Sequence, residues 1–157
     1  MEISGKPTVH PFLFAGGKIA GYFAWLNLVL VLSGYSGLRH SAGSWVDYSA
    51  YFALVAGFSL VLISSLSLGR SIRIGLPTGE TSLRTNGIYS LSRNPMYLGV
   101  HLVTLAAILL TLKWWVILPG IFSIYAYHQI VLGEERFLEQ RFGTPYSLYK
   151  KSTRRYF

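Results

Sequence analysis

Long apolar segments are the feature that most constrains how this chain can fold. Residues 18–38 and 45–68 each form an almost uncharged run of more than 20 residues, and two shorter apolar runs follow at 96–112 and 116–132. A helix needs about 20 apolar residues to cross the hydrocarbon core of a bilayer. The sequence therefore predicts an all-α integral membrane protein with four transmembrane helices, of which the last two form a helical hairpin.

The composition also favours a lipid environment. Only 13% of the residues are charged and 52% are hydrophobic, whereas soluble domains carry about 25% charged residues. A length of 157 residues predicts a single membrane domain over residues 1–157. The chain has no Cys, which excludes disulfides, thiolate metal sites and a Cys nucleophile. The four His residues show no metal-ligand spacing, so no metal is expected.

The basic residues indicate what the protein binds and how it is oriented in the membrane. The net charge is +8, but the Lys and Arg residues flank the apolar runs, which favours membrane lipids over nucleic acid as partners. With a cytoplasmic N-terminus, only Arg39 and Lys113 of the 14 Lys and Arg residues lie outside. We therefore expect a multi-pass protein of an inner or plasma membrane, with both termini cytoplasmic. The cytoplasmic set comprises Lys6, Lys18, Arg70, Arg73, Arg84, Arg93 and six residues of the C-terminal tail.

Small residues recur at a spacing of four within the first two spans. Such pairs let helix backbones approach closely. They predict contacts between helices, with a dimer interface as the alternative. The pairs are Gly17 and Gly21, Ser33 and Gly37, and Ala53 and Gly57.

The polar segment 69–95 ends in three residues that predict the start of the third span. Asn94 suits an N-cap and Pro95 suits the first helical turn. The free N–H groups and the positive dipole end of this helix, together with Arg93, favour an anion such as a carboxylate or a phosphate. The alternative is a capped helix whose Arg93 only anchors to lipid headgroups.

Polar side chains also lie inside the last two spans. Tyr97 and His101 share one face of the third span, and Tyr125, His128 and Gln129 cluster on the fourth. Polar groups inside a span usually face the bundle interior or a wet cavity. Two such patches predict a polar cavity between the helices, and the alternative is that each His is a packing residue.

Two adjacent acids, Glu134 and Glu135, follow the fourth span directly. If the helix continues without a break, Glu134 and Arg141 share a face. The rest of the segment predicts an amphipathic C-terminal helix on the membrane surface. Carboxylates close to Arg93 also predict a site for a zwitterionic or sulfonium ligand, with its carboxylate toward Arg93 and its cation toward either acid.

Three stretches in this order carry a family resemblance: LGRSIRIG, TNGIYSLSRNPMYLG and EERFLEQRFGTPYSLYKK. Over residues 66–155 the chain resembles the isoprenylcysteine carboxyl methyltransferase family and its bacterial and phospholipid-methyltransferase relatives. The family motif G-x-Y-x-x-x-R-H-P-x-Y-x-G corresponds to Gly87, Tyr89, Arg93, Asn94, Pro95, Tyr97 and Gly99. The tail motif corresponds to Glu134, Glu135, Leu138, Phe142, Gly143, Tyr146 and Tyr149.

The resemblance implies a membrane methyltransferase that uses S-adenosyl-L-methionine and acts on a lipophilic or small acceptor. It implies a cofactor-binding region at 69–99 plus 128–155. The expected cofactor contacts are Tyr89, Arg93, Asn94, Pro95, Tyr97, Leu98, Gly99, His128 and Glu134. Glu135 and Arg141 match the acid and the Arg that the family places near the reacting sulfur. Helix geometry pairs Arg141 with Glu134 instead, so Glu134, Glu135 and Arg141 are all candidate catalytic residues.

Two departures and two alternatives accompany the resemblance. Asn94 replaces the family's His and cannot titrate near neutrality, and the tail lacks an arginine-then-proline ending. One alternative is an NADPH-dependent membrane reductase related to sterol reductases, which would use the arginines at 70, 73, 84 and 93; the small size argues against it. The other alternative is a non-enzymatic membrane scaffold.

Overall fold

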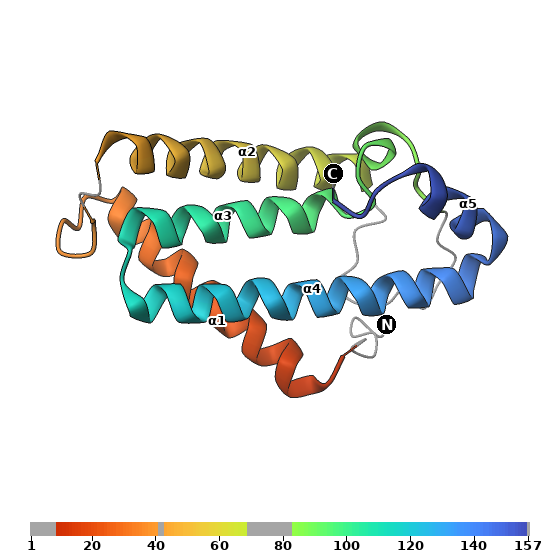
Figure 1. Cartoon of the computed structure of the whole chain (residues 1–157), viewed down its shortest axis with the longest axis horizontal. Coiled ribbons are helices and arrows are strands. Elements are labelled where there is room, and N and C mark those ends of the chain that lie inside the picture. Colours follow the sequence, from red (N-terminus) through yellow and green to blue (C-terminus); the bar gives the residue numbers. More distant parts are fainter. Residues whose placement is uncertain (1–8, 41–42, 69–82, 157) are drawn as a thin grey trace.

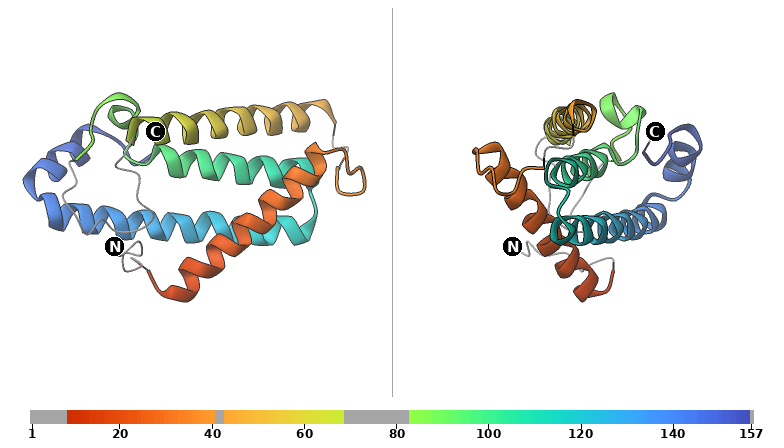
Figure 2. Two further views of the ribbon diagram at one scale, coloured as in Figure 1. Left: turned by 180° about the vertical axis from the view of Figure 1, so that it is seen from behind. Right: turned by 60° about the vertical axis from the view of Figure 1, so that its left-hand side comes forward.

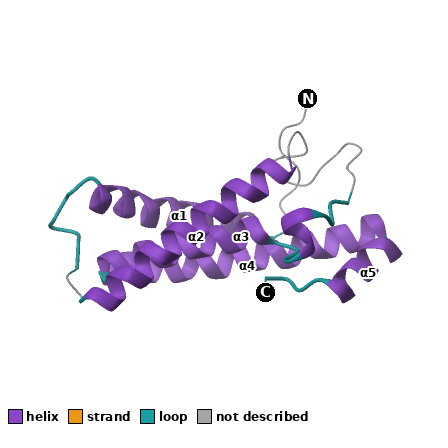
Figure 3. Ribbon diagram, turned by 90° about the horizontal axis from the view of Figure 1, so that it is seen from above, coloured by secondary structure: helices purple, strands orange, loops and turns teal. Residues whose placement is uncertain are grey.

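The computed structural model describes residues 9–40, 43–68 and 83–156. Every regular element in these segments is helical (Figure 1; Figure 3), which confirms the predicted all-α fold for this part of the chain. The elements are α1 (Pro11–Leu32), α2 (Ser44–Leu68), the 3-10 helix η2 (Gly87–Ser90), α3 (Pro95–Thr111), α4 (Trp114–Phe142) and α5 (Thr144–Ser152).

Three of these helices, α1, α2 and α4, are long and apolar enough to cross a membrane. The third predicted span, 96–112, corresponds to α3, which has 17 residues and falls short of that length. The predicted span 45–68 agrees with α2 to within one residue. Over the described residues the fold is therefore that of an all-α membrane protein, with three helices rather than four that meet the length of a span.

Helix α1 lies earlier in the chain than the predicted span 18–38. It begins at Pro11, which suits the first helical position, and Gly34, with a φ of +90°, follows its last turn. Lys18 consequently lies inside the helix, with its Nζ atom 3.9 Å from the centroid of the Phe14 ring. Ser33 lies beyond the last residue of the helix, so it was wrong to pair it with Gly37 as a helix-packing contact.

Helix α4 is longer than the predicted span 116–132. It continues from the apolar segment through both adjacent acids and ends at Phe142, where Gly143 adopts a φ of +57°. The left-handed region at Gly143 is accessible to glycine at little cost and separates α4 from α5. The predicted amphipathic C-terminal helix is thus divided between the last turns of α4 and the separate helix α5.

Small residues bring the helices together in two pairs. Helix α2 packs mainly on α3, and α1 packs mainly on α4, while α1 crosses α4 obliquely (Figure 1; Figure 2). A Cβ atom added to Gly57 would lie 2.7 Å from the carbonyl oxygen of Gly99, and one added to Gly21 would lie 2.7 Å from Oγ of Ser123. The predicted packing role is confirmed for Gly17, Gly21 and Gly57.

Helices α3 and α4 run antiparallel and are joined at Leu112 and Lys113 (Figure 1). Each nevertheless makes its more extensive contacts with another helix. The last two predicted spans therefore do not pack mainly on each other as a separate hairpin. The close contact between Gly57 and Gly99 brings α3 nearest to α2 instead.

The chain segments distribute between two ends of the helix bundle. The start of α1, the end of α2, the segment 83–94, α5 and residues 153–156 gather at one end, which we call the α5 end (Figure 2). The turns after α1 and α3 lie at the opposite end. Large apolar side chains along α2 are exposed, among them Phe52, Val55, Phe58 and Leu66, as expected of a surface that faces lipid.

Candidate functional site

The segment before α3 and the C-terminal tail lie side by side at the α5 end. The backbone N–H of Arg93 donates to the carbonyl of Arg154 at 2.9 Å, and that of Asn94 donates to the carbonyl of Arg155 at 3.2 Å. The Ser92 hydroxyl also donates to the carbonyl of Arg155, at 3.0 Å. These bonds place the tail, defined here as residues 153–156, against the first turn of α3.

Glu135 is the centre of the contacts between the tail, α3 and α4. Its side chain is 5% exposed. One carboxylate oxygen accepts hydrogen bonds from Arg93 at 3.0 and 3.3 Å and from Nδ2 of Asn94 at 2.9 Å. The other oxygen accepts from Arg155 at 3.0 and 3.1 Å. We call these four residues the Glu135 cluster; its two guanidinium groups stabilise the ionised carboxylate.

Arg93 is a structural partner of this carboxylate. Its side chain is 7% exposed, and its remaining nitrogen, Nη1, donates to the backbone carbonyls of Lys150 and Thr153. The predicted arrangement placed a ligand carboxylate on Arg93 and a ligand cation on Glu134 or Glu135. In the structure Arg93 and Glu135 bind each other instead, because a buried guanidinium and a buried carboxylate within reach form a strong charge-assisted pair.

Asn94 occupies the predicted N-cap position and Pro95 the first turn of α3, but the Asn94 side chain makes no capping hydrogen bond. Its amide donates to the Glu135 carboxylate instead, a charged acceptor that binds the N–H more strongly than a neutral partner would. The expected side-chain cap is therefore wrong, although the helix boundary is right.

The second acid, Glu134, faces a different set of residues. Successive residues on a helix point about 100° apart, so Glu134 turns away from the Glu135 cluster. It accepts a hydrogen bond of 2.7 Å from the Tyr97 hydroxyl, and the Tyr97 ring lies 6.0 Å from that of Tyr127. Arg141 is exposed on the last turn of α4.

Arg141 does not hydrogen-bond Glu134 in the structure. The carbon of its guanidinium lies 5.9 Å from the ring centroids of both Phe137 and Phe142. The unbroken helix puts Glu134 and Arg141 seven residues apart, about 10 Å along the axis. This rise explains why sharing a face does not by itself bring the two groups into contact.

His101 of α3 and His128 of α4 both lie beside the tail residue Tyr156. Nδ1 of His128 and the Tyr156 hydroxyl are 2.9 Å apart, and the Tyr156 ring lies 5.8 Å from that of His101 and 5.9 Å from that of His128. Tyr156 thus occupies the space where a polar cavity was predicted. Tyr125 is 54% exposed and belongs to another face of α4.

Sequence reasoning missed Arg155 and Tyr156 as site residues. No periodic pattern marks them, because they follow α5 as irregular chain. The one available signal was the pair of arginines directly before the final aromatic residues.

Other predicted cofactor contacts have structural partners. Gly99 packs against Gly57, Leu98 is half-buried on α3, and the carbonyl of Tyr89 accepts a hydrogen bond from the Tyr149 hydroxyl. Burial raises the pKa of Tyr89 to about 12, so its phenol stays protonated. Residues 69–82 of the predicted cofactor region, with Arg70 and Arg73, and also Lys6, lie outside the described residues.

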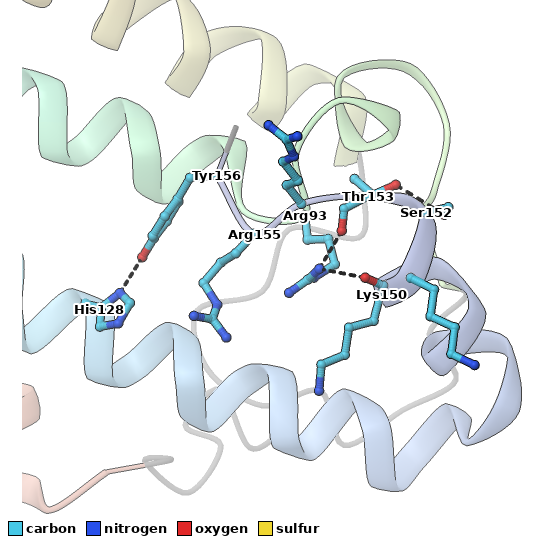
Figure 4. Close-up of a pocket in the computed structure, with 9 residues that line it drawn as sticks. Arg93, His128, Lys150, Ser152, Thr153, Arg155 and Tyr156 are labelled. Carbon is cyan, nitrogen blue, oxygen red and sulfur yellow. Dashed lines mark hydrogen bonds between the residues drawn. The ribbon is translucent and has the colours of Figure 1, made fainter.

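A cavity of about 660 Å³ opens between α4 and the tail (Figure 4). We call it the tail cavity. Five of its lining side chains are cationic and none is acidic, and Nζ of Lys150 is paired at 3.0 Å with Glu139 outside the lining. This charge favours an anionic group inside. The lining residues are Arg93, His128, Lys150, Lys151, Ser152, Thr153, Arg154, Arg155 and Tyr156.

The chain matches the model of a known protein family. The family model for phospholipid methyltransferase matches residues 45–145, a segment that runs from α2 into the start of α5 and includes Arg93 and Glu135. No curated protein and no solved structure matches the chain. The match confirms the resemblance that the motifs predict and covers more than half of the sequence. The protein belongs to the phospholipid methyltransferase family, a family of membrane methyltransferases.

Proposed function

We propose that the protein is an S-adenosyl-L-methionine-dependent methyltransferase that acts in the membrane on a lipophilic or small acceptor. The observation that carries this proposal is the Glu135 cluster. It ties the start of α3, the end of α4 and the tail into one unit beside the tail cavity. A polar pocket at the end of apolar helices allows a water-soluble cofactor to meet a lipid-dissolved acceptor.

The residues at the α5 end fit this cofactor. The tail cavity offers cationic donors for a carboxylate, and its volume falls within the range of roughly 300–1,000 Å³ typical of ligand pockets. Glu134 with the rings of Tyr97 and Tyr127 offers a carboxylate and aromatic faces, which attract a positively charged group. When bound, the cofactor would supply a methyl group carried on a sulfonium sulfur.

The protein's own contribution is positioning and the exclusion of water, which are the main requirements of a methyl displacement. Glu135 acts as a positioning residue, since both of its oxygens are engaged by Arg93, Asn94 and Arg155. Glu134, held by Tyr97, is the candidate to accept a proton from an acceptor that carries one. Arg141, beside two phenylalanine rings, is the candidate to orient a polar or anionic acceptor.

We further propose that α1, α2, α3 and α4 all cross the bilayer and that both termini are cytoplasmic, in an inner or plasma membrane. Helix α3 has 17 residues, about 25 Å of helix, which approaches the hydrocarbon thickness of about 30 Å. The basic residues of the α5 end support the orientation, because cytoplasmic segments carry an excess of Lys and Arg.

The test is calorimetric titration of the detergent-purified protein with S-adenosylhomocysteine and, in parallel, with NADPH. We expect S-adenosylhomocysteine to bind with a Kd on the order of micromolar, which corresponds to about −8 kcal/mol, and NADPH not to bind. Glu134→Gln should weaken binding or turnover, whereas Glu139→Gln, on the exposed turn beyond, should not. Binding of NADPH alone would favour a reductase, and binding of neither would favour a scaffold.

A further inference from the structure

The strongest feature outside the Glu135 cluster is the contact of the tail with His101 and His128. The backbone bonds to Arg154 and Arg155 and the Arg155–Glu135 ion pair hold the tail in place. The next residue, Tyr156, is thereby placed with its ring beside both His101 and His128. Its hydroxyl lies 2.9 Å from Nδ1 of His128 (Figure 4).

The direction of this hydrogen bond follows from the available partners. Burial raises the pKa of the Tyr156 phenol, so the phenol carries its proton. His128 is the one hydrogen-bond partner of the Tyr156 hydroxyl among the described residues. If Nδ1 of His128 were the donor, no residue in the described segments would accept the phenol hydrogen, which is costly in a half-buried site. This balance favours the arrangement in which the hydroxyl donates to Nδ1.

A neutral imidazole that accepts a hydrogen bond at Nδ1 carries its own proton on Nε2. His128 lines the tail cavity, and its hydrogen bond to Tyr156 uses Nδ1 and does not engage Nε2. The remaining guanidinium nitrogen of Arg155, Nη1, is likewise outside the bonds to Glu135. In this arrangement the cavity holds an N–H donor among cationic side chains.

We propose that Tyr156 is a positioning residue that holds His128 in its Nε2–H tautomer, so that Nε2 donates a hydrogen bond to an oxyanion in the tail cavity. The proposal rests on the proposed function for the identity of the ligand. The oxyanion has two possible sources with the same chemistry, the carboxylate of the cofactor and the phosphate of a lipid headgroup. Both offer acceptors only, which matches a lining with five cationic side chains and no acidic one.

The tautomer is tested directly by long-range proton–nitrogen NMR of the full chain, labelled with ¹⁵N at histidine and held in detergent micelles. The chain has four His residues, and His128→Gln identifies the His128 signals by their loss. We expect the Nε2–H pattern in the unmodified protein and a mixture of tautomers in Tyr156→Phe, which keeps the ring but lacks the hydroxyl. Tyr125→Phe, at an exposed position of α4, is the matched control and should change nothing. An Nδ1–H pattern in the unmodified protein, or no change in Tyr156→Phe, overturns the proposal.

The ligand group is tested by calorimetric binding of S-adenosylhomocysteine, its decarboxylated analogue and a short-chain phospholipid. We expect Tyr156→Phe to weaken binding of an oxyanion ligand roughly 3- to 10-fold, the size of one hydrogen bond. A loss seen with S-adenosylhomocysteine but not with the analogue assigns the carboxylate, and a loss seen with the phospholipid assigns the phosphate. Unchanged binding of all three ligands overturns the proposal.

A double variant distinguishes a role of Tyr156 in positioning His128 from a role in packing alone. In the His128→Gln background the amide N–H₂ donates without help from Tyr156, so Tyr156→Phe should have no further effect on binding. Additive losses would contradict the proposed coupling. If S-adenosylhomocysteine does not bind the unmodified protein while the tautomer and the phospholipid effect hold, the proposed function fails and this inference stands.

Discussion

Two ion pairs have the same distance between nitrogen and oxygen but differ in how far their side chains are exposed to solvent. Glu135 and Arg93 are 3.0 Å apart with side chains 5% and 7% exposed, whereas Glu139 and Lys150 are 3.0 Å apart with both side chains 41% exposed. Water screens the second pair, and such surface pairs are worth about 0–1 kcal/mol. Removing one partner of a buried pair leaves an uncompensated charge and costs about 3–5 kcal/mol.

Glu135→Gln should therefore lower the free energy of unfolding by about 3 kcal/mol, because the guanidiniums of Arg93 and Arg155 lose their shared anion. Thermal unfolding in detergent measures the loss. Glu139→Gln is the matched control, one helical turn further along α4, and should change stability by less than about 1 kcal/mol. Equal effects of the two substitutions would show that the Glu135 cluster does not hold the tail.

Asn94 gives a second prediction at this scale. Its Nδ2 atom is 2.9 Å from the Glu135 carboxylate, so Asn94→Asp would set two carboxylates at that distance. We expect Asn94→Asp to lower the thermal unfolding temperature clearly and Asn94→His, which retains an N–H donor, to lower it little. If Asn94→Asp unfolds at the temperature of the unmodified protein, the amide is not a partner of Glu135.

Among the helices, the crossing of α2 and α3 is set by backbone contact. A Cβ atom on Gly99 would lie 2.6 Å from the carbonyl oxygen of Gly57 and 3.0 Å from the backbone nitrogen of Val61. Backbone atoms cannot move aside as the end of a flexible side chain can. This close approach brings the first turn of α3, with Arg93 and Asn94 just before it, into its position at the α5 end.

Gly99→Ala should consequently destabilise the protein by about 1–3 kcal/mol, the usual cost of overpacking, and should weaken binding of the proposed cofactor by displacing α3. Gly16→Ala is the control, since its Cβ atom would lie 3.5 Å from the Phe122 ring, an ordinary contact. Because Ala favours helices over Gly by up to about 1 kcal/mol, Gly16→Ala should be neutral or stabilising. Chemical or thermal unfolding measures the stability of both variants. A Gly99→Ala protein as stable as the unmodified protein would contradict the close approach of α2 and α3 at this residue.

At the scale of the whole molecule, positively charged side chains are concentrated at one end of the helix bundle. The cationic tail cavity lies at the α5 end, while Arg39, paired with Asp47 at 3.6 Å, and Lys113 lie at the other end. This asymmetry is the basis for the proposed orientation, because the cytoplasmic side of a membrane protein is the more basic side.

The chain has no Cys, so single Cys residues report the orientation without background. In sealed inside-out vesicles, a membrane-impermeant maleimide should label Ser152→Cys at the α5 end. It should label Ser36→Cys and Lys113→Cys only after the vesicles are opened. Labelling of Ser152→Cys and Lys113→Cys from the same side would show that α4 does not cross the membrane. Labelling of Lys113→Cys and Ser36→Cys from opposite sides would show that one of the two helices between them, α2 or α3, does not cross.

The amino-acid sequence by itself determined the helical fold, the bounds of α2 and α3 to within one residue, and the family. These properties depend on local signals: apolar run length, Pro95 at a helix start, and motif residues at fixed spacing. The ends of α1 and α4 were less predictable, because polar residues such as Lys18 and Glu134 continue a helix when neighbouring helices accommodate them.

Only the tertiary structure decided which groups meet. Glu135 could have faced Arg141 on its own helix, yet it binds Arg93 and Arg155, and the gap between polar patches of α3 and α4 is filled by Tyr156. Spacing along one helix defines a face but not its partner. The partners are determined when distant segments fold together, because each buried charge then needs an opposite charge and each buried hydrogen-bond donor needs an acceptor.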